Sequence, residues 1–208
     1  HADHVTAAGT LREQTQCLTA VSAAAGVACA DRPVQDGDSL PFGQYAVEAR
    51  STPGHTSGCM TYVVHDGPRT LAFTGDAIFV RGCGRTDFQQ GDSRTLFHSV
   101  HSQIFSLGDD AILYPGHDYK GHSQTTVAEE KAHNPRLNTS ISEDEFVAIM
   151  DNLNLGLPKK IDIAVPANLG CGLPKEADQN QEREVPEVSP NAVVDRSQWR
   201  IVDVREPH

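Results

Sequence analysis

The stretch T-L-A-F-T-G-D, residues 70–76, ends a run of strand-forming side chains with a glycine and an aspartate. The same layout recurs in T-P-G-H-T at 52–56 and in Y-P-G-H-D at 114–118, where a histidine follows the glycine. Glycine lets the backbone turn sharply, and the segment before it fixes where the next side chain lies. Three such ends at one edge of a sheet would bring imidazoles and a carboxylate within reach of one cation.

The candidate ligands at these ends are His55, Asp76 and His117. The opening H-A-D-H adds His1, Asp3 and His4 at a spacing suited to a strand-to-helix turn. A single Gly-Asp or Gly-His pair is usually only a turn. All of them together predict a metal site.

The remaining periodicities predict an α/β protein with largely antiparallel sheets and covering helices. Alternating apolar residues at 45–49, followed by the runs C-M-T-Y-V-V, T-L-A-F-T-G and A-I-L-Y, are typical of strands. Helical spacing predicts helices at 6–16, 92–107, 124–133 and 142–153. The last of these begins with a capping box, Ser142 and Glu145.

Composition excludes some function classes. The 208-residue chain has a net charge of -11 and no basic stripe, which argues against a nucleic-acid partner. It has no apolar run of membrane-spanning length, which argues against a membrane partner. The five cysteines are odd in number and contain no C-x-x-C, which argues against a disulfide framework and favours a reducing compartment.

The order H-x-D-H, G-H, G-D, G-H resembles the metallo-β-lactamase superfamily from residue 1 to about 173. Longer strings resemble its persulfide (sulfur) dioxygenase family more closely: S-T-P-G-H-T-S-G-C, F-T-G-D-A-I-F-V-R-G-C-G-R-T-D-F-Q-Q-G, Y-P-G-H-D-Y, N-P-R-L and A-V-P-A-N-L-G-C-G. The resemblance implies an αββα sandwich that lacks its N-terminal strands in this chain.

The resemblance also implies one iron(II) per chain, held by two histidines and one aspartate. His55 and Asp76 match the second and third ligands, whereas the first would lie two positions before His1. We therefore expect an N-terminally incomplete chain that takes up little O2 until it is extended upstream. The residues that would surround the iron, or hold a second metal, are His1, Asp3, His4 and His117.

The implied partners are glutathione persulfide and O2, which would give sulfite and glutathione, with a homo-oligomer among the candidate assemblies. The implied location is the cytoplasm of a bacterium or the mitochondrial matrix of a eukaryote. Arg85 and Tyr119 are the candidate catalytic and substrate-binding residues, Asn168 is a further substrate contact, and Arg81 is a weaker choice. A guanidinium can grip a substrate carboxylate with two hydrogen bonds.

Two alternatives remain open. A dinuclear zinc thioester hydrolase of the glyoxalase II kind would use Asp3, His4, Asp76 and His117. A non-catalytic role would follow from the missing ligand. Cys83, between two glycines, is either a reactive thiol or a small buried residue in a tight loop. His98 and His101 are interpreted as packing residues, not as metal-binding ones.

Three regions are predicted along the chain. Residues 1–173 form the metallo-β-lactamase-type domain, and 174–192, which are polar and proline-containing, form a linker. The tail at 193–208 contains W-R-I-V-D-V-R-E-P, which resembles the first strand of a rhodanese domain.

Overall fold

The computed structural model describes residues 1–156 and 159–173. The predicted linker at 174–192 and the rhodanese-like tail at 193–208 lie outside the described residues. Within the described part, no helix is long and apolar enough to cross a membrane.

A six-stranded sheet forms the centre of the fold, in the order β3-β4-β5-β6-β7-β8. Its strands are β3 (Ser39–Phe42), β4 (Tyr45–Ser51), β5 (Met60–Asp66), β6 (Arg69–Gly75), β7 (Ile112–Pro115) and β8 (Thr125–Thr126). All neighbours are antiparallel except β6 and β7, which are parallel. The carboxyl ends of β6 and β7 therefore meet at one edge of the sheet. A separate parallel pair joins β1 (Ala20–Ser22) and β2 (Arg32–Val34).

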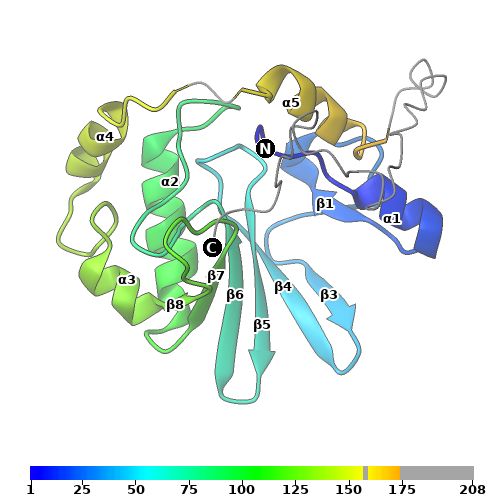
Figure 1. Cartoon of the computed structure of the whole chain (residues 1–208). Helices are drawn as coiled ribbons and strands as arrows, with labels where there is room; N and C mark the ends of the chain where they lie inside the picture. Colours follow the sequence, from blue (N-terminus) through cyan, green and yellow to red (C-terminus); the bar gives the residue numbers. More distant parts are fainter. Residues whose placement is uncertain (157–158, 174–208) are drawn as a thin grey trace, which may run out of the picture. The chain divides into compact units, whose positions relative to one another are not determined.

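Helices flank the six-stranded sheet on both sides, as Figure 1 shows. On one side lie α2 (Ser93–Ser99), α3 (Val127–His133) and α4 (Glu143–Asp151); on the other lie α1 (Ala8–Thr15) and α5 (Ile161–Leu169). The short turns are η1 (Ala23–Ala25), η2 (Val100–Ile104) and η3 (Phe105–Leu107). The predicted α/β class is confirmed.

The core lies between the sheet and helices α2 to α4. Val63, Ala72 and Leu113 form a row across β5, β6 and β7, and all three are fully buried. The fully buried side chains Leu96 and Phe146 pack in the same cluster from α2 and α4. This packing fixes the strands whose ends carry the candidate ligands.

Two of the predicted helices differ in detail from the structure. The helix expected at 92–107 is α-helical only through Ser99, because the N–H of Val100 bonds to the carbonyls of both Leu96 and Phe97 and a π turn follows. The helix expected at 124–133 begins at Val127, because the two preceding threonines pair with β7 as strand β8. The capping box of α4 is confirmed.

The expectation that the cysteines form no disulfide is wrong. Cys29 and Cys171 are bonded, with their Cα atoms 6.1 Å apart and 142 positions between them in sequence. An odd count leaves one cysteine unpaired but does not prevent a pair, and only the folded chain brings these two together. Cys17 is free and exposed, while Cys59 and Cys83 are free and buried.

Candidate metal centre

Strand ends position the central carboxylate and one imidazole. Asp76 directly follows β6, and Gly75 before it has a positive φ of 51°. His117 follows β7, where the N–H of Gly116 donates to the carbonyl of Gly75 at 2.8 Å. The parallel pairing of the two strands therefore places His117 beside Asp76, as the shared Gly-Asp and Gly-His layout predicts.

His55 reaches the same edge from the loop between β4 and β5. Gly54 before it has a φ of 130°, and a Cβ there would lie 2.4 Å from the backbone of Leu96. Only glycine allows this approach to α2. The loop thus packs on the N-terminal end of α2 and turns the imidazole toward Asp76.

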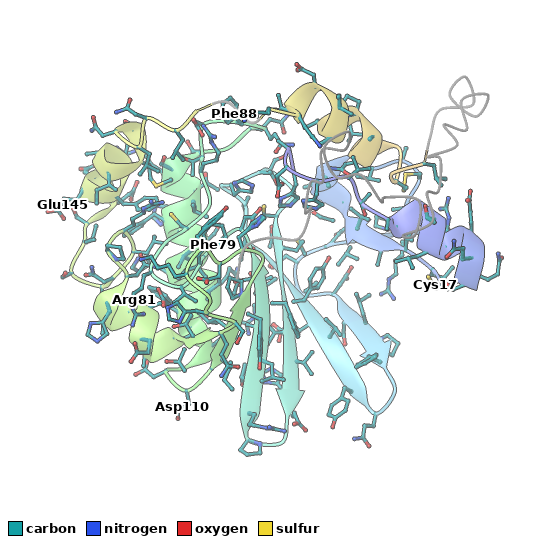
Figure 2. All side chains as sticks on the ribbon, viewed as in Figure 1. Cys17, Phe79, Arg81, Phe88, Asp110 and Glu145 are labelled. Atoms are coloured by element: carbon teal, nitrogen blue, oxygen red, sulfur yellow. A yellow bond between two sulfur atoms is a disulfide. The ribbon has the colours of Figure 1, made fainter. Side chains whose placement is uncertain are left out.

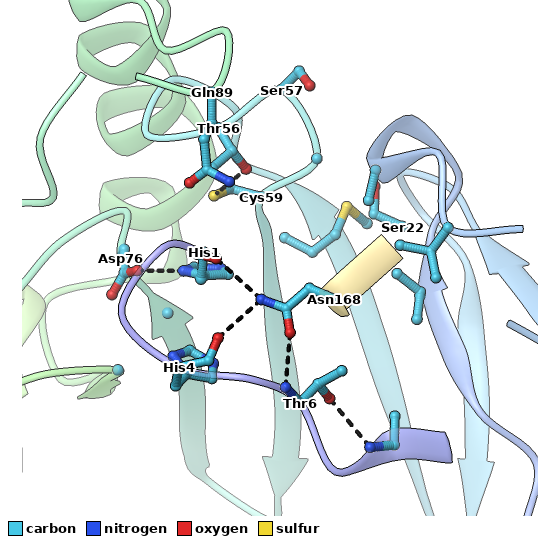
Figure 3. Close-up of a pocket in the computed structure, with 18 of the residues that line it drawn as sticks. His1, His4, Thr6, Ser22, Thr56, Ser57, Cys59, Asp76, Gln89 and Asn168 are labelled. Atoms are coloured by element: carbon cyan, nitrogen blue, oxygen red, sulfur yellow. Dashed lines mark hydrogen bonds and ion pairs between the residues drawn. The ribbon is translucent and has the colours of Figure 1, made fainter. Parts of the chain in front are cut away.

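One oxygen of Asp76 contacts two imidazoles. Its Oδ2 lies 2.7 Å from Nδ1 of His1 and 3.2 Å from Nε2 of His55. Figure 3 shows the first of these contacts as a dashed line. Ligand atoms of His1, His55 and Asp76 all lie within 4.8 Å of one another, which is close enough to share one metal ion. Two histidines and a carboxylate form the donor set of a facial triad.

The other oxygen of Asp76 faces a second group of side chains. Its Oδ1 lies 3.5 Å from Nε2 of His117, and that nitrogen lies 3.2 Å from Oδ2 of Asp3. Oδ1 of Asp3 lies 3.1 Å from Nδ1 of His4. The structure therefore joins His55, Asp76 and all four surrounding candidates through one connected set of contacts.

The buried carboxylate of Asp76 is stabilised by positive charge from its neighbours. Asp76 is only 5% exposed. Burial opposes its ionisation, but hydrogen bonds and charges from His1 and His55 outweigh burial and hold the pKa of Asp76 well below its ordinary value. The hydrogen bond to Asp76 raises the pKa of His1 against the opposing effect of burial. A buried carboxylate needs such partners, and a bound cation would satisfy the same need.

A carbonyl on the neighbouring loop orients His55. Its Nδ1 donates to the carbonyl of Arg85 at 2.7 Å, which fixes the ring so that Nε2 faces Asp76. The N–H of Gly84 donates to the carbonyl of Asp76 at 2.9 Å. A Cβ on Gly84 would lie 2.4 Å from that carbonyl oxygen and 2.9 Å from Nδ1 of His55. The loop and the two candidate ligands are in direct contact.

Asn168 binds the opening segment of the chain. Its Nδ2 donates to the carbonyls of His1 and His4 at 3.0 Å each, and its Oδ1 accepts from the N–H of Thr6 at 2.7 Å (Figure 3). These three hydrogen bonds occupy both ends of the amide. Asn168 of α5 therefore positions the H-A-D-H segment, and its role as a substrate contact stays a prediction.

A cavity of about 610 Å³ opens beside the cluster. Its lining includes His55, Asp76, His117 and Tyr119, together with four cationic residues, Arg81, Arg85, Lys120 and Arg136. A second cavity of about 770 Å³, drawn in Figure 3, borders the opposite side of the H-A-D-H segment and is lined largely by apolar side chains. The first cavity is the better match for an anionic substrate, because its walls carry the cations.

The two arginines predicted at the site are already paired. Arg85 makes two hydrogen bonds to Asp87, at 2.6 and 2.7 Å, and a third to the carbonyl of Gly156. Arg81 lies beside α3 (Figure 2) and pairs there with Glu129 and Glu130. An anion that binds Arg81 or Arg85 must exchange with the carboxylates that now pair with them.

The structure favours packing roles for two of the sequence candidates, Cys83 and His101. Cys83 is 4% exposed, and burial raises the pKa of its thiol to about 11, so it is a poor nucleophile at neutral pH. His101 stacks on Phe97 with ring centroids 4.2 Å apart, away from the cluster.

Sequence reasoning missed two cations in the cavity. Lys120 comes directly after Tyr119, and Arg136 lies within the N-P-R-L string. Their adjacency to predicted site segments is the signal that could have identified them. Tyr119 itself is 81% exposed and lies parallel to the ring of His117, with centroids 6.0 Å apart.

Comparisons with known proteins agree with this geometry. The sequence profile described as "Metallo-beta-lactamase superfamily" matches residues 1–117. The human protein named "Persulfide dioxygenase ETHE1, mitochondrial" is 53% identical over 163 residues, which are 78% of this chain and 62% of the human one. The chain thus spans less than two thirds of the length of that relative.

Two further comparisons show how similar the chain is to each kind of relative. The crystal structure of ETHE1 from Myxococcus xanthus superposes with a TM-score of 0.78 at 50% identity, covering 83% of this chain and 74% of the other. The "Hydroxyacylglutathione hydrolase GloC" of Haemophilus influenzae is 40% identical over 105 residues, which are 50% of this chain and 47% of the hydrolase. The hydrolase similarity is therefore lower and covers less of the chain.

Proposed function

The chain belongs to the metallo-beta-lactamase superfamily and to its ETHE1 branch, and we propose that it oxidises glutathione persulfide with O2 at one iron(II) per chain. The observation that carries this proposal is the His1, His55 and Asp76 group, which opens on a cation-lined cavity. About half of the aligned residues are identical to those of proteins named ETHE1, and the human one is named a persulfide dioxygenase.

The proposed reaction converts one glutathione persulfide, one O2 and one water into glutathione and sulfurous acid, which ionises to sulfite. The terminal sulfur loses four electrons, O2 gains them, and the sulfur–sulfur bond breaks with its electron pair leaving on the glutathione sulfur. Iron, when bound, would supply the redox chemistry that lets O2 oxidise the sulfur, which redox-inert zinc could not.

The donor set fits such an ion. We propose His55 and Asp76 as ligands, because both lie at the cluster centre and His55 is oriented by the carbonyl of Arg85. The family pattern puts the remaining histidine two positions before His1, whereas the ring of His1 lies within ligand distance here. The metal affinities of His1→Ala and His55→Ala variants decide whether His1 is a ligand. If it is, His1→Ala should lose as much affinity as His55→Ala; if His1 only lies beside the ligands, the loss should be far smaller.

Substrate carboxylates require cations in an acidic protein. We propose that Lys120 and Arg136 supply them in the cavity, and that Arg85 joins them when the substrate displaces Asp87. Tyr119, stacked on His117 beside the centre, is proposed to hydrogen-bond the persulfide sulfur. These residues bind and orient the substrate.

A zinc thioester hydrolase is the second candidate, because Nε2 of His117 lies 3.5 Å from the second oxygen of Asp76 and 3.2 Å from Oδ2 of Asp3. That arrangement would suit a second metal ion, and proteins named hydroxyacylglutathione hydrolase are among the relatives. A eukaryotic version of this chain would act in the mitochondrial matrix, as the name of the human relative suggests, and a bacterial one in the cytoplasm.

The deciding experiment combines metal analysis with two assays. The chain, and a version extended before His1, are loaded anaerobically with Fe(II) or Zn(II) and tested for O2 uptake with glutathione persulfide and for hydrolysis of a glutathione thioester. We expect one iron per chain, sulfite formation matching O2 uptake, and loss of both in Asp76→Asn. Two zinc ions with thioester hydrolysis, and no persulfide oxidation, would refute the proposal.

A further inference from the structure

The carboxylate of Glu130 in α3 is completely buried and has no part in the proposed reaction. It accepts four hydrogen bonds. Oε1 accepts from Nη1 of Arg81 at 2.7 Å and from Oγ1 of Thr125 at 2.7 Å. Oε2 accepts from the backbone N–H of Arg81 at 3.0 Å and from Nδ2 of Asn134 at 2.8 Å. A buried charge is tolerated only with partners of this kind.

These bonds fix one end of the loop at 81–85. Arg81 has a φ of 60°, in the left-handed region that costs energy for a residue with a side chain. Glu130 binds both the N–H and the guanidinium of this residue, so it offsets that cost. Asn134, held by Glu130, also donates to the carbonyl of Gly82 at 3.1 Å.

The other end of the same loop contacts the candidate metal centre. Arg85 accepts the hydrogen bond from His55, and Gly84 donates to the backbone of Asp76. Gly84 has no space for a side chain between these two residues. A displacement of the loop therefore moves the carbonyl that selects the tautomer and ring plane of His55.

We propose that Glu130 is a positioning residue for the metal centre, acting through the loop at 81–85 to hold the ring of His55. The inference rests on the proposed function only in treating His55 as a ligand. It does not depend on which substrate the centre oxidises or hydrolyses. Glu130 acts on metal binding without touching the metal.

The test replaces Glu130 with glutamine. Glutamine has nearly the same shape, but its NH2 group would replace one of the two accepting oxygens. In either orientation it would face two hydrogen-bond donors, from Arg81 and Thr125 or from Arg81 and Asn134. The readouts are the dissociation constant for Co(II), from titration, and the visible absorption of bound Co(II), which reports ligand geometry. We expect Glu130→Gln to bind Co(II) about tenfold more weakly, with an altered spectrum, since partners that orient ligands contribute on this scale.

Two control variants separate positioning from general stability. Glu129→Gln removes the exposed partner of the Arg81 guanidinium but leaves the loop backbone bonded, so Co(II) affinity should stay within twofold of the original chain. Val127→Ala opens a cavity in the same helix and should lower the unfolding temperature without weakening Co(II) binding. Glu130→Asp, which keeps the charge on a shorter side chain, should give a smaller loss than glutamine and serves as the test if the glutamine variant does not fold.

The outcomes separate this inference from the proposed function. Unchanged Co(II) affinity and spectrum in the Glu130 variants, or an equal loss in Val127→Ala, would overturn the positioning role. Weakened Co(II) binding in a chain that never oxidises persulfide would leave the positioning role standing and defeat only the proposed reaction.

Discussion

Adding a single methyl group at Gly84 should disrupt the metal centre from its backbone side. In Gly84→Ala, the new Cβ would lie 2.4 Å from the carbonyl oxygen of Asp76 and 2.9 Å from Nδ1 of His55, both well inside contact distance. The loop must move away, which weakens the hydrogen bonds from Gly84 to Asp76 and from His55 to Arg85. Two hydrogen bonds at about 1 kcal/mol each, with about 1–3 kcal/mol for overpacking, give a loss of roughly 3–5 kcal/mol.

The assays are thermal unfolding of the metal-free chain and titration with Co(II). A loss of this size should lower the unfolding temperature by roughly 6–20 °C in a domain of this length. Metal affinity should fall by about 10- to 100-fold, because the carbonyl that orients His55 is displaced.

Gly82→Ala is the matched control in the same loop. A Cβ there meets nothing closer than 3.9 Å, so the variant should unfold and bind Co(II) like the original chain. If Gly84→Ala binds Co(II) as tightly as Gly82→Ala, the loop does not position His55 and the reasoning fails.

Three further predictions follow from the fold. Asp92→Ala removes the cap that accepts the N–H of Thr95 at the start of α2, at a cost of about 1 kcal/mol near pH 7. The hydrogen bond to Thr95 lowers the pKa of Asp92 in the folded chain. The stabilisation is therefore present above about pH 4, the pKa of an unfolded aspartate, and is lost as the pH falls through the folded pKa. Urea unfolding curves of Asp92→Ala and the original chain that do not converge in acid would contradict this. Phe146→Ala should cost about 3–5 kcal/mol in urea unfolding, because the ring is fully buried, and a loss below 1 kcal/mol would mean that the core is not packed as described. Cys29→Ser opens the disulfide and should cost about 2–4 kcal/mol, whereas Cys17→Ser, at a free exposed cysteine, should cost almost nothing; equal effects would argue against the bond.

The strand-end residues were predictable because their positions follow from local rules. An apolar run ending in Gly-Asp or Gly-His places the polar residue at the end of a strand, and Asp76 and His117 lie there. The capping box at Ser142 was predictable for the same reason, since all its contacts lie within one helical turn. Local chemistry therefore predicted the central strands and the strand-end members of the cluster, whereas it did not predict helix α5 or the β1–β2 pair.

Long-range pairing was not predictable in this way. Asn168 binds a segment 162 to 167 positions away, and its sequence context gives no signal of that contact. The disulfide at Cys29 likewise depends on the fold as a whole. Arg85 was predicted to bind a substrate carboxylate, and its pairing with the nearby carboxylate of Asp87 depends on the conformation of its loop. Which partner each of these side chains binds depends on the folded structure, not on the neighbouring sequence.

The parallel pairing of β6 and β7 separates two tasks that an enzyme must perform. The strand ends fix Asp76 and His117, while the segments that follow, at 77–91 and 118–124, supply much of the cavity lining. The segment at 118–124 can change in length and sequence without moving Asp76 or His117, since the strands are anchored in the core, whereas the loop at 81–85 is bonded to both His55 and Asp76. Relatives of this chain accordingly include proteins named for oxygenation and others named for hydrolysis. Substrate preference can therefore diverge most easily in the lining segments that do not contact the candidate ligands, and the same layout would let a designer graft a different preference onto those segments.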